Sequence, residues 1–373
     1  MAKSKELEQY ITINTSLINK KEIFRMLALA HSASLPILLV GPPGTGKTRV
    51  VLDYAKAWLM NNVDKENKDE VAQAGKNFME KVYILETDEG TKASEVKGMP
   101  DIEQIFTHNK YALNTPIADA EIVIINEVDK ASSAIRNSLL GVMNEKFLFN
   151  GKSKIPCKWK LFVATCNEIP KEEENSPFWD RFILKKTVNR VSAGELVTYF
   201  NKGGKEFNEK IEINIPTKAE VAAINLPINK IEKYLEVAYS HCSDRTLTFV
   251  PTLTKSISQI WEESMDKALM RTANIMIGTA ASSELQDKLM STEVKSLLSK
   301  IEVLWSINDS TVIEAHLSEI ETLIKGYASQ GKMDESQVQE IESSIQYILS
   351  EHPIKKLENE AETLAADLIN NIK

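Results

Sequence analysis

The stretch Ile37-Leu-Leu-Val-Gly41-Pro-Pro-Gly-Thr-Gly-Lys47-Thr48 decides the fold of this chain. Its apolar start, Ile37 to Val40, predicts a buried strand, and the residues from Arg49 to Leu59 predict a helix. Between the two lies the pattern G-x-x-x-x-G-K-T, which is typical of a loop that holds phosphate groups at a helix N-terminus. We therefore expect the chain to bind a nucleoside triphosphate.

Each residue type in this loop suits the binding of phosphate. Glycine lets backbone N–H groups curve around an anion because it has no Cβ. Lys47 adds a positive charge for the β- and γ-phosphates, and the Thr48 hydroxyl is suited to coordinating Mg²⁺. A glycine-rich turn with an incidental lysine is the alternative, and the length of the match argues against it. The predicted nucleotide-binding residues are Gly41, Pro42, Pro43, Gly44, Thr45, Gly46, Lys47 and Thr48.

Composition and charge narrow the functional classes. The 373 residues are 43% hydrophobic and 26% charged, as in ordinary globular proteins of two or three domains. The longest apolar runs, such as Ile122 to Ile125, are too short to span a bilayer, and the N-terminus lacks the apolar core of a signal peptide. Three cysteines without a C-x-x-C pair indicate a reduced, cytoplasmic setting. A net charge of −8 argues against binding to nucleic acid.

Apolar runs alternate with helical stretches over residues 1–190. Such alternation predicts an α/β fold, with a parallel sheet that helices cover on both faces. The polar run at residues 61–70 indicates a surface connection, and Asn150-Gly151 indicates a tight hairpin. Besides the strand at residues 37–40, the expected elements are a helix at residues 20–32 and strands at residues 82–85, 122–125 and 159–165.

Helical patterns dominate after residue 190. We expect one helical region at residues 191–282 and a second at residues 283–373. In the second region, two sets of three apolar residues have i, i+4, i+7 spacing, which favours the seams of a small helical bundle over a groove for a partner. These residues are Leu297, Ile301 and Leu304, and Ile341, Ile345 and Leu349.

Two polar residues follow the apolar strand at residues 122–125. Glu127, at the C-terminal tip of the strand, is suited to polarise the water that attacks the nucleotide; a charge that merely caps the strand is the alternative. In ATPases with this loop, the position of Asn126 usually holds an aspartate that retains Mg²⁺. The asparagine accepts a hydrogen bond but brings no charge, so we expect weaker retention of Mg²⁺.

Three further residues are candidates for the site. Asn167, at the end of the fourth strand, can orient the attacking water, or it is an ordinary residue of a turn. Arg181 is either an ion-pair partner of Asp180 or a cation that reaches the γ-phosphate of a neighbouring subunit. Arg245 opens a helix in the region 191–282, where it senses the γ-phosphate of its own subunit or lies at the surface.

In this order, the loop, the glutamate, the asparagine and the two arginines resemble an AAA+ ATPase. More narrowly, the chain resembles the MoxR family and, within it, the RavA-type ATPases. The resemblance covers about residues 15–280. It is carried by Ala120-Glu-Ile-Val-Ile-Ile-Asn-Glu-Val-Asp-Lys-Ala131, Ala134-Ile-Arg-Asn-Ser-Leu-Leu140, Asn144-Glu-Lys-Phe-Leu-Phe-Asn-Gly151, Cys166-Asn-Glu-Ile-Pro170 and Ser243-Asp-Arg245.

The resemblance implies an AAA+ αβα core at residues 1–190, an α-helical lid at 191–282 and an α-helical C-terminal region at 283–373. It assigns Asn167 to sensor 1, Arg181 to the arginine that acts in trans and Arg245 to sensor 2. It also identifies Glu86–Gly98 as an insertion in the second core helix and Phe147–Ile155 as the hairpin before sensor 1.

For function, the resemblance implies a hexameric ring that uses ATP and Mg²⁺ to remodel a protein partner, often a protein with a von Willebrand A domain. The chain lacks the β-rich insertion through which RavA proteins bind a partner, so the identity of the partner does not carry over. Two alternatives stay open. One is a DNA-dependent AAA+ motor, and the other is a nucleotide-gated scaffold whose hydrolysis is very slow.

Overall fold

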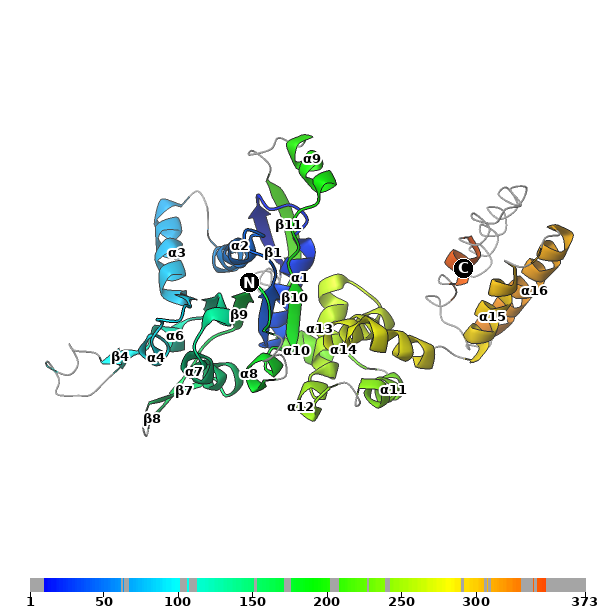
Figure 1. Cartoon of the computed structure of the whole chain (residues 1–373). Coiled ribbons are helices and arrows are strands. Elements are labelled where there is room, and N and C mark those ends of the chain that lie inside the picture. Colours follow the sequence, from blue (N-terminus) through cyan, green and yellow to red (C-terminus); the bar gives the residue numbers. More distant parts are fainter. Residues whose placement is uncertain are drawn as a thin grey trace, which may run out of the picture. The chain divides into compact units, whose positions relative to one another are not determined.

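The computed structural model forms two compact units, residues 1–282 and 283–373, which are described separately (Figure 1). The structure describes residues 10–61, 63, 67–100, 106, 113–150, 153–170, 176–201, 208–226, 228–238, 242–289, 292–304, 307, 310–329, 338 and 341–346. None of the helices in these ranges combines the length and apolar character that a membrane-spanning segment requires.

A parallel five-stranded sheet forms the centre of the first unit, with strand order β10-β2-β9-β6-β3. The α/β fold expected from the sequence is thus confirmed. In the register of the sheet, Val40 lies opposite Cys166, and Glu86 lies opposite Asn126. The polar residues that follow these strands therefore meet at one edge of the sheet. The strands are β2 (Pro36–Val40), β3 (Val82–Glu86), β6 (Ile122–Asn126), β9 (Leu161–Cys166) and β10 (Leu184–Thr187).

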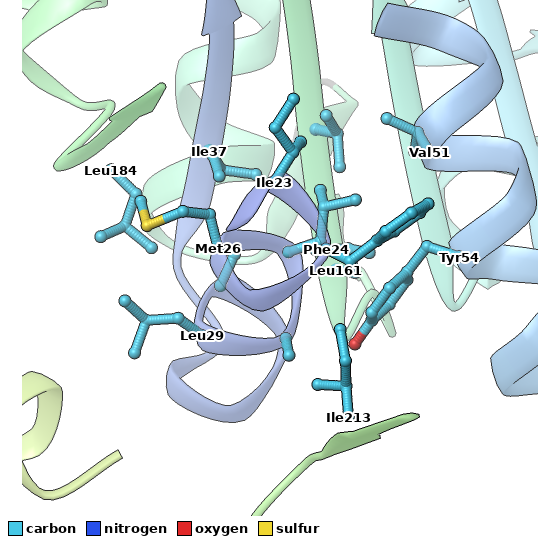
Figure 2. Close-up of a cluster of buried hydrophobic side chains, with 14 of the residues drawn as sticks. Ile23, Phe24, Met26, Leu29, Ile37, Val51, Tyr54, Leu161, Leu184 and Ile213 are labelled. Carbon is cyan, nitrogen blue, oxygen red and sulfur yellow. The ribbon is translucent and has the colours of Figure 1, made fainter. Parts of the chain in front are cut away.

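Alternate residues of the strands point to opposite faces, and each face is covered by helices. Ile37 and Ile124 pack with α1 and α2 in one buried cluster, whereas Leu38 and Ile125 pack with α7 in another. Figure 2 shows the first cluster, in which Phe24 of α1 and Tyr54 of α2 lie beside strand residues. The helices of this part are α1 (Lys21–Ala33), α2 (Lys47–Leu59), α3 (Lys68–Lys81), α4 (Ala93–Lys97), α6 (Pro116–Asp119), α7 (Ser133–Asn144) and α8 (Pro177–Asp180), with a 3-10 turn at Val128–Lys130.

The structure corrects the expectation for residues 61–70. Helix α3 begins at Lys68, inside this polar run, and the side chain of Asn67 accepts hydrogen bonds from the N–H groups of Asp69 and Glu70. Such polar side chains favour a helix start as well as a loop, since they cap the free N–H groups of the first turn. Residues 62 and 64–66 lie outside the described ranges.

Three antiparallel ribbons accompany the parallel sheet. The hairpin predicted near Asn150 is confirmed by β7 (Phe147–Asn150) and β8 (Ser153–Pro156), and β4 (Met99–Pro100) pairs with β5 (Leu113–Asn114). The ribbon of β1 (Tyr10–Thr15) and β11 (Glu209–Asn214) was not expected, because β11 lies in a region whose pattern favoured helices. The buried apolar residues of each strand are two alternate isoleucines, and the further buried residue of β1 is the polar Thr15, so the apolar signal of both strands is weak.

The remaining helices of the first unit follow in sequence. Helix α13 packs on α1, and its Leu253 and Ile257 join the cluster of Figure 2. Thr254 of α13 and Thr272 of α14 share a buried hydrogen bond of 3.0 Å. These helices are α9 (Ala193–Asn201), α10 (Lys218–Ala223), α11 (Ile228–Ala238), α12 (Asp244–Leu247), α13 (Val250–Trp261) and α14 (Met265–Leu289), the last of which continues past Ser282.

The second unit contains α15 (Thr292–Val303) and α16 (Ser310–Ser329). Five of the six residues in the predicted apolar stripes lie in one buried cluster with α16, which contributes Ile313, Leu317, Ile320 and Ile324. The sixth, Leu349, lies outside the described residues. The stripes are therefore occupied by contacts within this unit, as in the interior of a small helical bundle.

Candidate functional site

The phosphate-loop pattern lies between β2 and α2, where the backbone adopts an unusual conformation. Gly44 and Gly46 have φ angles of 79° and 82°, in the left-handed region that favours glycine. Gly46 occupies the N-cap position of α2, and no side chain caps this helix. The N–H groups of the first helical turn are therefore available to an anion that the helix N-terminus attracts.

Two neighbouring segments fix the start of the loop. The N–H of Gly41 donates to the carbonyl oxygen of Cys166 at 3.2 Å, and the N–H of Val188 donates to that of Val40 at 2.7 Å. A Cβ on Gly41 would lie only 2.3 Å from the carbonyl oxygen of Val188. A glycine is therefore required here by the close approach of two backbones.

The ammonium group of Lys47 lies inside the loop. Its Nζ donates to the carbonyl oxygens of Gly41 and Pro42, at 2.6 and 3.1 Å, and to Oδ1 of Asn167 at 3.3 Å. Partial burial lowers the pKa of Lys47, and the carboxylates of Asp129 and Glu127 act in the opposite direction. The structure thus brings Asn167, which the sequence placed 120 residues away, next to the lysine of the loop.

Asn126 stands at the centre of a second set of hydrogen bonds. Its Oδ1 accepts from the hydroxyl groups of Thr48, at 3.0 Å, and Thr165, at 3.1 Å. Its Nδ2 donates to Oε1 of Glu86 at 2.6 Å, and the residue is only 2% exposed. Neither Thr165 nor Glu86 was predicted as a site residue from the sequence, although Thr165 ends one predicted strand and Glu86 directly follows another.

Glu127 lies in a conformation that non-glycine residues rarely adopt, with φ 55° and ψ 41°. Its N–H donates to the Thr165 hydroxyl at 3.3 Å, and the Thr87 hydroxyl donates to its carbonyl oxygen at 2.8 Å. Lys130 Nζ donates to Oε2 of Glu127 at 2.6 Å, and the carboxylate is 44% exposed. These bonds hold the backbone in place and leave the carboxylate accessible to water.

Asp129 is a further acidic residue at this edge of the sheet. Its Oδ2 accepts from the N–H of Asn167 at 3.3 Å, while its Oδ1 is buried without a hydrogen-bond partner among the described residues. Burial raises the pKa of the adjacent Cys166 thiol to about 12, and the charge of Asp129 adds to this effect. Cys166 is therefore a neutral thiol, and Asp129 positions the backbone of Asn167.

Arg181 and Arg245 belong to a separate cluster at α7, α8 and α12. Arg181 Nη1 lies 3.0 Å from Oδ2 of Asp180, and Arg245 Nη2 donates to Oδ1 of Asn144 at 2.8 Å. Burial lowers the pKa of Arg245, the charge of Arg181 lowers it further, and Asp180 opposes this shift. Among the interactions of the described residues, none joins either arginine to the loop at residues 41–48.

With this geometry established, comparison with known proteins identifies the family. Residues 5–226 match the family model of the MoxR domain in the MoxR-vWA-beta-propeller ternary systems. The chain belongs to the MoxR family. The resemblance that the sequence motifs indicated at this level, including the AAA+ architecture, is confirmed.

Among curated relatives, an uncharacterized protein of Methanocaldococcus jannaschii is 27% identical to this MoxR chain over 229 residues, which are 60% of this chain and 54% of the relative. The chain therefore matches about half of that relative's length. The chaperone protein ClpB of Chlamydia pneumoniae is 24% identical over 227 residues, which are 60% of this chain and 20% of ClpB.

Among solved structures, this MoxR chain is similar to a protein of Cytophaga hutchinsonii that is described as a candidate ATPase. The TM-score is 0.52, with 14% sequence identity, and the match covers 81% of this chain and 90% of the other. At this level of identity the likeness supports the fold alone.

Proposed function

We propose that this MoxR chain hydrolyses ATP in a ring of identical subunits. The observation that carries the proposal is the pairing of the first two residues of α2 with strand ends: Lys47 with Asn167, and Thr48 with Asn126. Two left-handed glycines and an uncapped helix N-terminus provide N–H donors for phosphates beside these pairs. The donor set fits a magnesium-bound triphosphate.

Each group would have a distinct task in this reaction. The N–H groups of residues 41–48 and the ammonium of Lys47 would bind the phosphate chain, and Thr48 and Asn126 would face the metal ion. Bound Mg²⁺ would supply positive charge to the phosphate oxygens. Glu127 would accept a proton from the attacking water, and Asn167 would orient that water. The side chain of Glu127 is 44% exposed, so water can reach it for this role.

The position of Arg181 supports a site that two subunits share. In its own subunit, Arg181 forms the ion pair with Asp180 that was one of its two expected roles, and no interaction among the described residues joins it to the loop. We assign to Arg181 the stabilisation of the transition state in the neighbouring subunit's site, where an arginine commonly contributes about 10³-fold or more to the rate. We assign to Arg245 the role of a sensor of the γ-phosphate on the lid.

The proposal extends to a protein partner and to a hexameric, RavA-like ring. The description of the matched family names von Willebrand A and β-propeller proteins in the same systems, which supports a partner from one of these classes. A nucleotide-gated scaffold is the second candidate, because the amide of Asn126 brings no charge to the metal. In that case the chain would bind ATP and hydrolyse it only over many minutes.

Mixing two inactive variants tests the shared site. The Arg181→Ala subunit keeps its own loop and Glu127 but provides no arginine to its neighbour. The Glu127→Gln subunit provides the arginine but lacks the base in its own site. In a 1:1 mixture assembled with ATP, the Arg181→Ala sites beside Glu127→Gln subunits should recover, and the rate should reach about a quarter of the wild-type value. Arg190 is exposed, so Arg190→Ala serves as the matched control and should keep the wild-type rate of ATP hydrolysis.

Three outcomes distinguish the candidates. Recovery on mixing supports hydrolysis at a shared site. Full activity of Arg181→Ala by itself rejects the assigned role of the arginine. If wild type binds ATP but converts less than one equivalent in a single-turnover experiment over several minutes, the nucleotide-gated scaffold replaces the ring ATPase.

A further inference from the structure

Glu86 is the acidic residue in contact with Asn126. The two residues end neighbouring parallel strands, β3 and β6, and lie opposite one another in the register of the sheet. Asn126 Nδ2 donates to Glu86 Oε1 at 2.6 Å, and this short bond joins a buried amide to an exposed carboxylate. A hydrogen bond to a charged acceptor is stronger than one between neutral groups.

This contact completes a line of three polar groups that starts at the loop. The Thr48 hydroxyl donates to Asn126 Oδ1 at 3.0 Å, and the amide of Asn126 in turn donates to Glu86. The second carboxylate oxygen of Glu86 has no hydrogen-bond partner among the described residues, and the residue is exposed to water. Glu86 therefore places an exposed carboxylate directly beside Asn126, the residue that accepts a hydrogen bond from the hydroxyl of Thr48.

The other carboxylates near the loop have different partners. Glu127 pairs with Lys130, and Asp129 accepts the backbone N–H of Asn167 through Oδ2, while its buried Oδ1 has no partner among the described residues. The described residues contain no group of three histidine, cysteine, aspartate or glutamate side chains that can hold a metal ion. Among the described residues, the negative charge available to a divalent ion beside Thr48 would come from the nucleotide and from single carboxylates near Asn126.

We propose that Glu86 supplies the negative charge that Asn126 lacks, and that it retains Mg²⁺ by accepting hydrogen bonds from the water molecules around the ion. Mg²⁺ keeps several of its waters in protein sites, so a carboxylate can act on it without direct coordination. Asn126 then has a positioning role: its Oδ1 faces Thr48 and its amide orients Glu86. This inference rests on the proposed binding of magnesium-bound ATP.

The Mg²⁺ dependence of nucleotide binding tests the inference without requiring hydrolysis. The full chain is titrated with MgCl₂ in the presence of a fluorescent, non-hydrolysable ATP analogue, and the half-saturating Mg²⁺ concentration is measured. Glu86→Gln should raise this concentration about tenfold, because one negative charge near a divalent ion is lost. Glu89→Gln removes the same charge from an exposed position three residues further on and should change it less than about twofold.

A double variant separates a role for charge from a role for folding. Glu86→Gln combined with Asn126→Asp moves the carboxylate from one strand end to the other and keeps the hydrogen bond between the two side chains. It should return the half-saturating Mg²⁺ concentration to within about threefold of wild type. A double variant that stays as defective as Glu86→Gln would overturn the inference.

The controls keep this inference distinct from the proposed function. If wild type binds the analogue with a clear dependence on Mg²⁺ and Glu86→Gln has the same dependence, the inference fails and the proposed nucleotide site stands. If wild type fails to bind the analogue at any Mg²⁺ concentration, the proposed nucleotide site itself is rejected.

Discussion

Replacing Gly41 with alanine tests whether the loop is held by its close contact with the segment after β10. The new Cβ would lie 2.3 Å from the carbonyl oxygen of Val188, and real Cβ contacts essentially never fall below 3.0 Å. Two backbones must therefore separate. Their separation weakens the bond from Val188 N–H to the carbonyl oxygen of Val40, which is 2.7 Å long.

The magnitude follows from these two effects. Overpacking of a tight contact costs about 1–3 kcal/mol, and a weakened backbone hydrogen bond costs about 1 kcal/mol. We expect the free energy of unfolding of the first unit to fall by about 2–4 kcal/mol, which lowers Tm by about 5–15 °C. Because the loop is displaced, ATP affinity measured well below Tm should fall about tenfold or more.

Thermal unfolding followed by circular dichroism, together with ATP titration, provides the assay. Gly75→Ala is the matched control, since a Cβ at Gly75 in α3 meets no atom within 4 Å. It should raise the stability slightly, because alanine favours a helix by about 1 kcal/mol over glycine. If Gly41→Ala keeps both its Tm and its ATP affinity, the loop is not fixed in the way described.

Three further predictions concern acid stability, the metal site and the second unit. Burial lowers the pKa of His31 to about 4, so protonation of the unfolded chain should reduce the stability by about 3 kcal/mol as the pH falls from 6.5 to 4. Denaturant titrations across this pH range should show that the free energy of unfolding of His31→Gln changes less with pH than that of the wild type. An equally steep change would contradict the lowered pKa of His31. Asn126→Asp places a carboxylate against Glu86, so Tm without Mg²⁺ should fall and the rise in Tm on adding Mg²⁺ with ATP should grow; an unchanged response would contradict this contact. Leu297→Ala should cost about 2–5 kcal/mol in the second unit and lower the helical signal, while ATP affinity stays within twofold; a large loss of affinity would show that the second unit supports the site.

The elements with continuous apolar runs were predictable from the sequence. Strands β2, β3 and β6 begin and end within one residue of the expected ranges, because all or most of their residues are apolar. The phosphate loop was recognisable because its chemistry requires particular residues at fixed spacing. Asn167, which directly follows β9, lies within hydrogen-bond distance of Lys47 in the loop, so its expected position beside the loop is confirmed while its role stays a prediction.

Elements with weak local signals were missed. In β10 only Leu184 is buried, and β11 depends on pairing with β1, about 200 residues earlier in the chain. The contact between Glu86 and Asn126 depends on the register of two strands that lie 40 residues apart. Strand order and register result from tertiary packing, so the residues of one strand do not reveal which side chains its neighbour presents.

Calorimetric titration of the full chain with ATP and Mg²⁺, beside the variant Lys47→Ala, tests the proposed site most directly. Lys47 lies among the carbonyl oxygens of Gly41 and Pro42, so its loss removes the cation at the point where the phosphates are expected. The wild-type chain should bind one ATP, and the variant should bind at least about 100-fold more weakly. Equal affinities for the two chains would show that the loop at residues 41–48 is not the site of nucleotide binding.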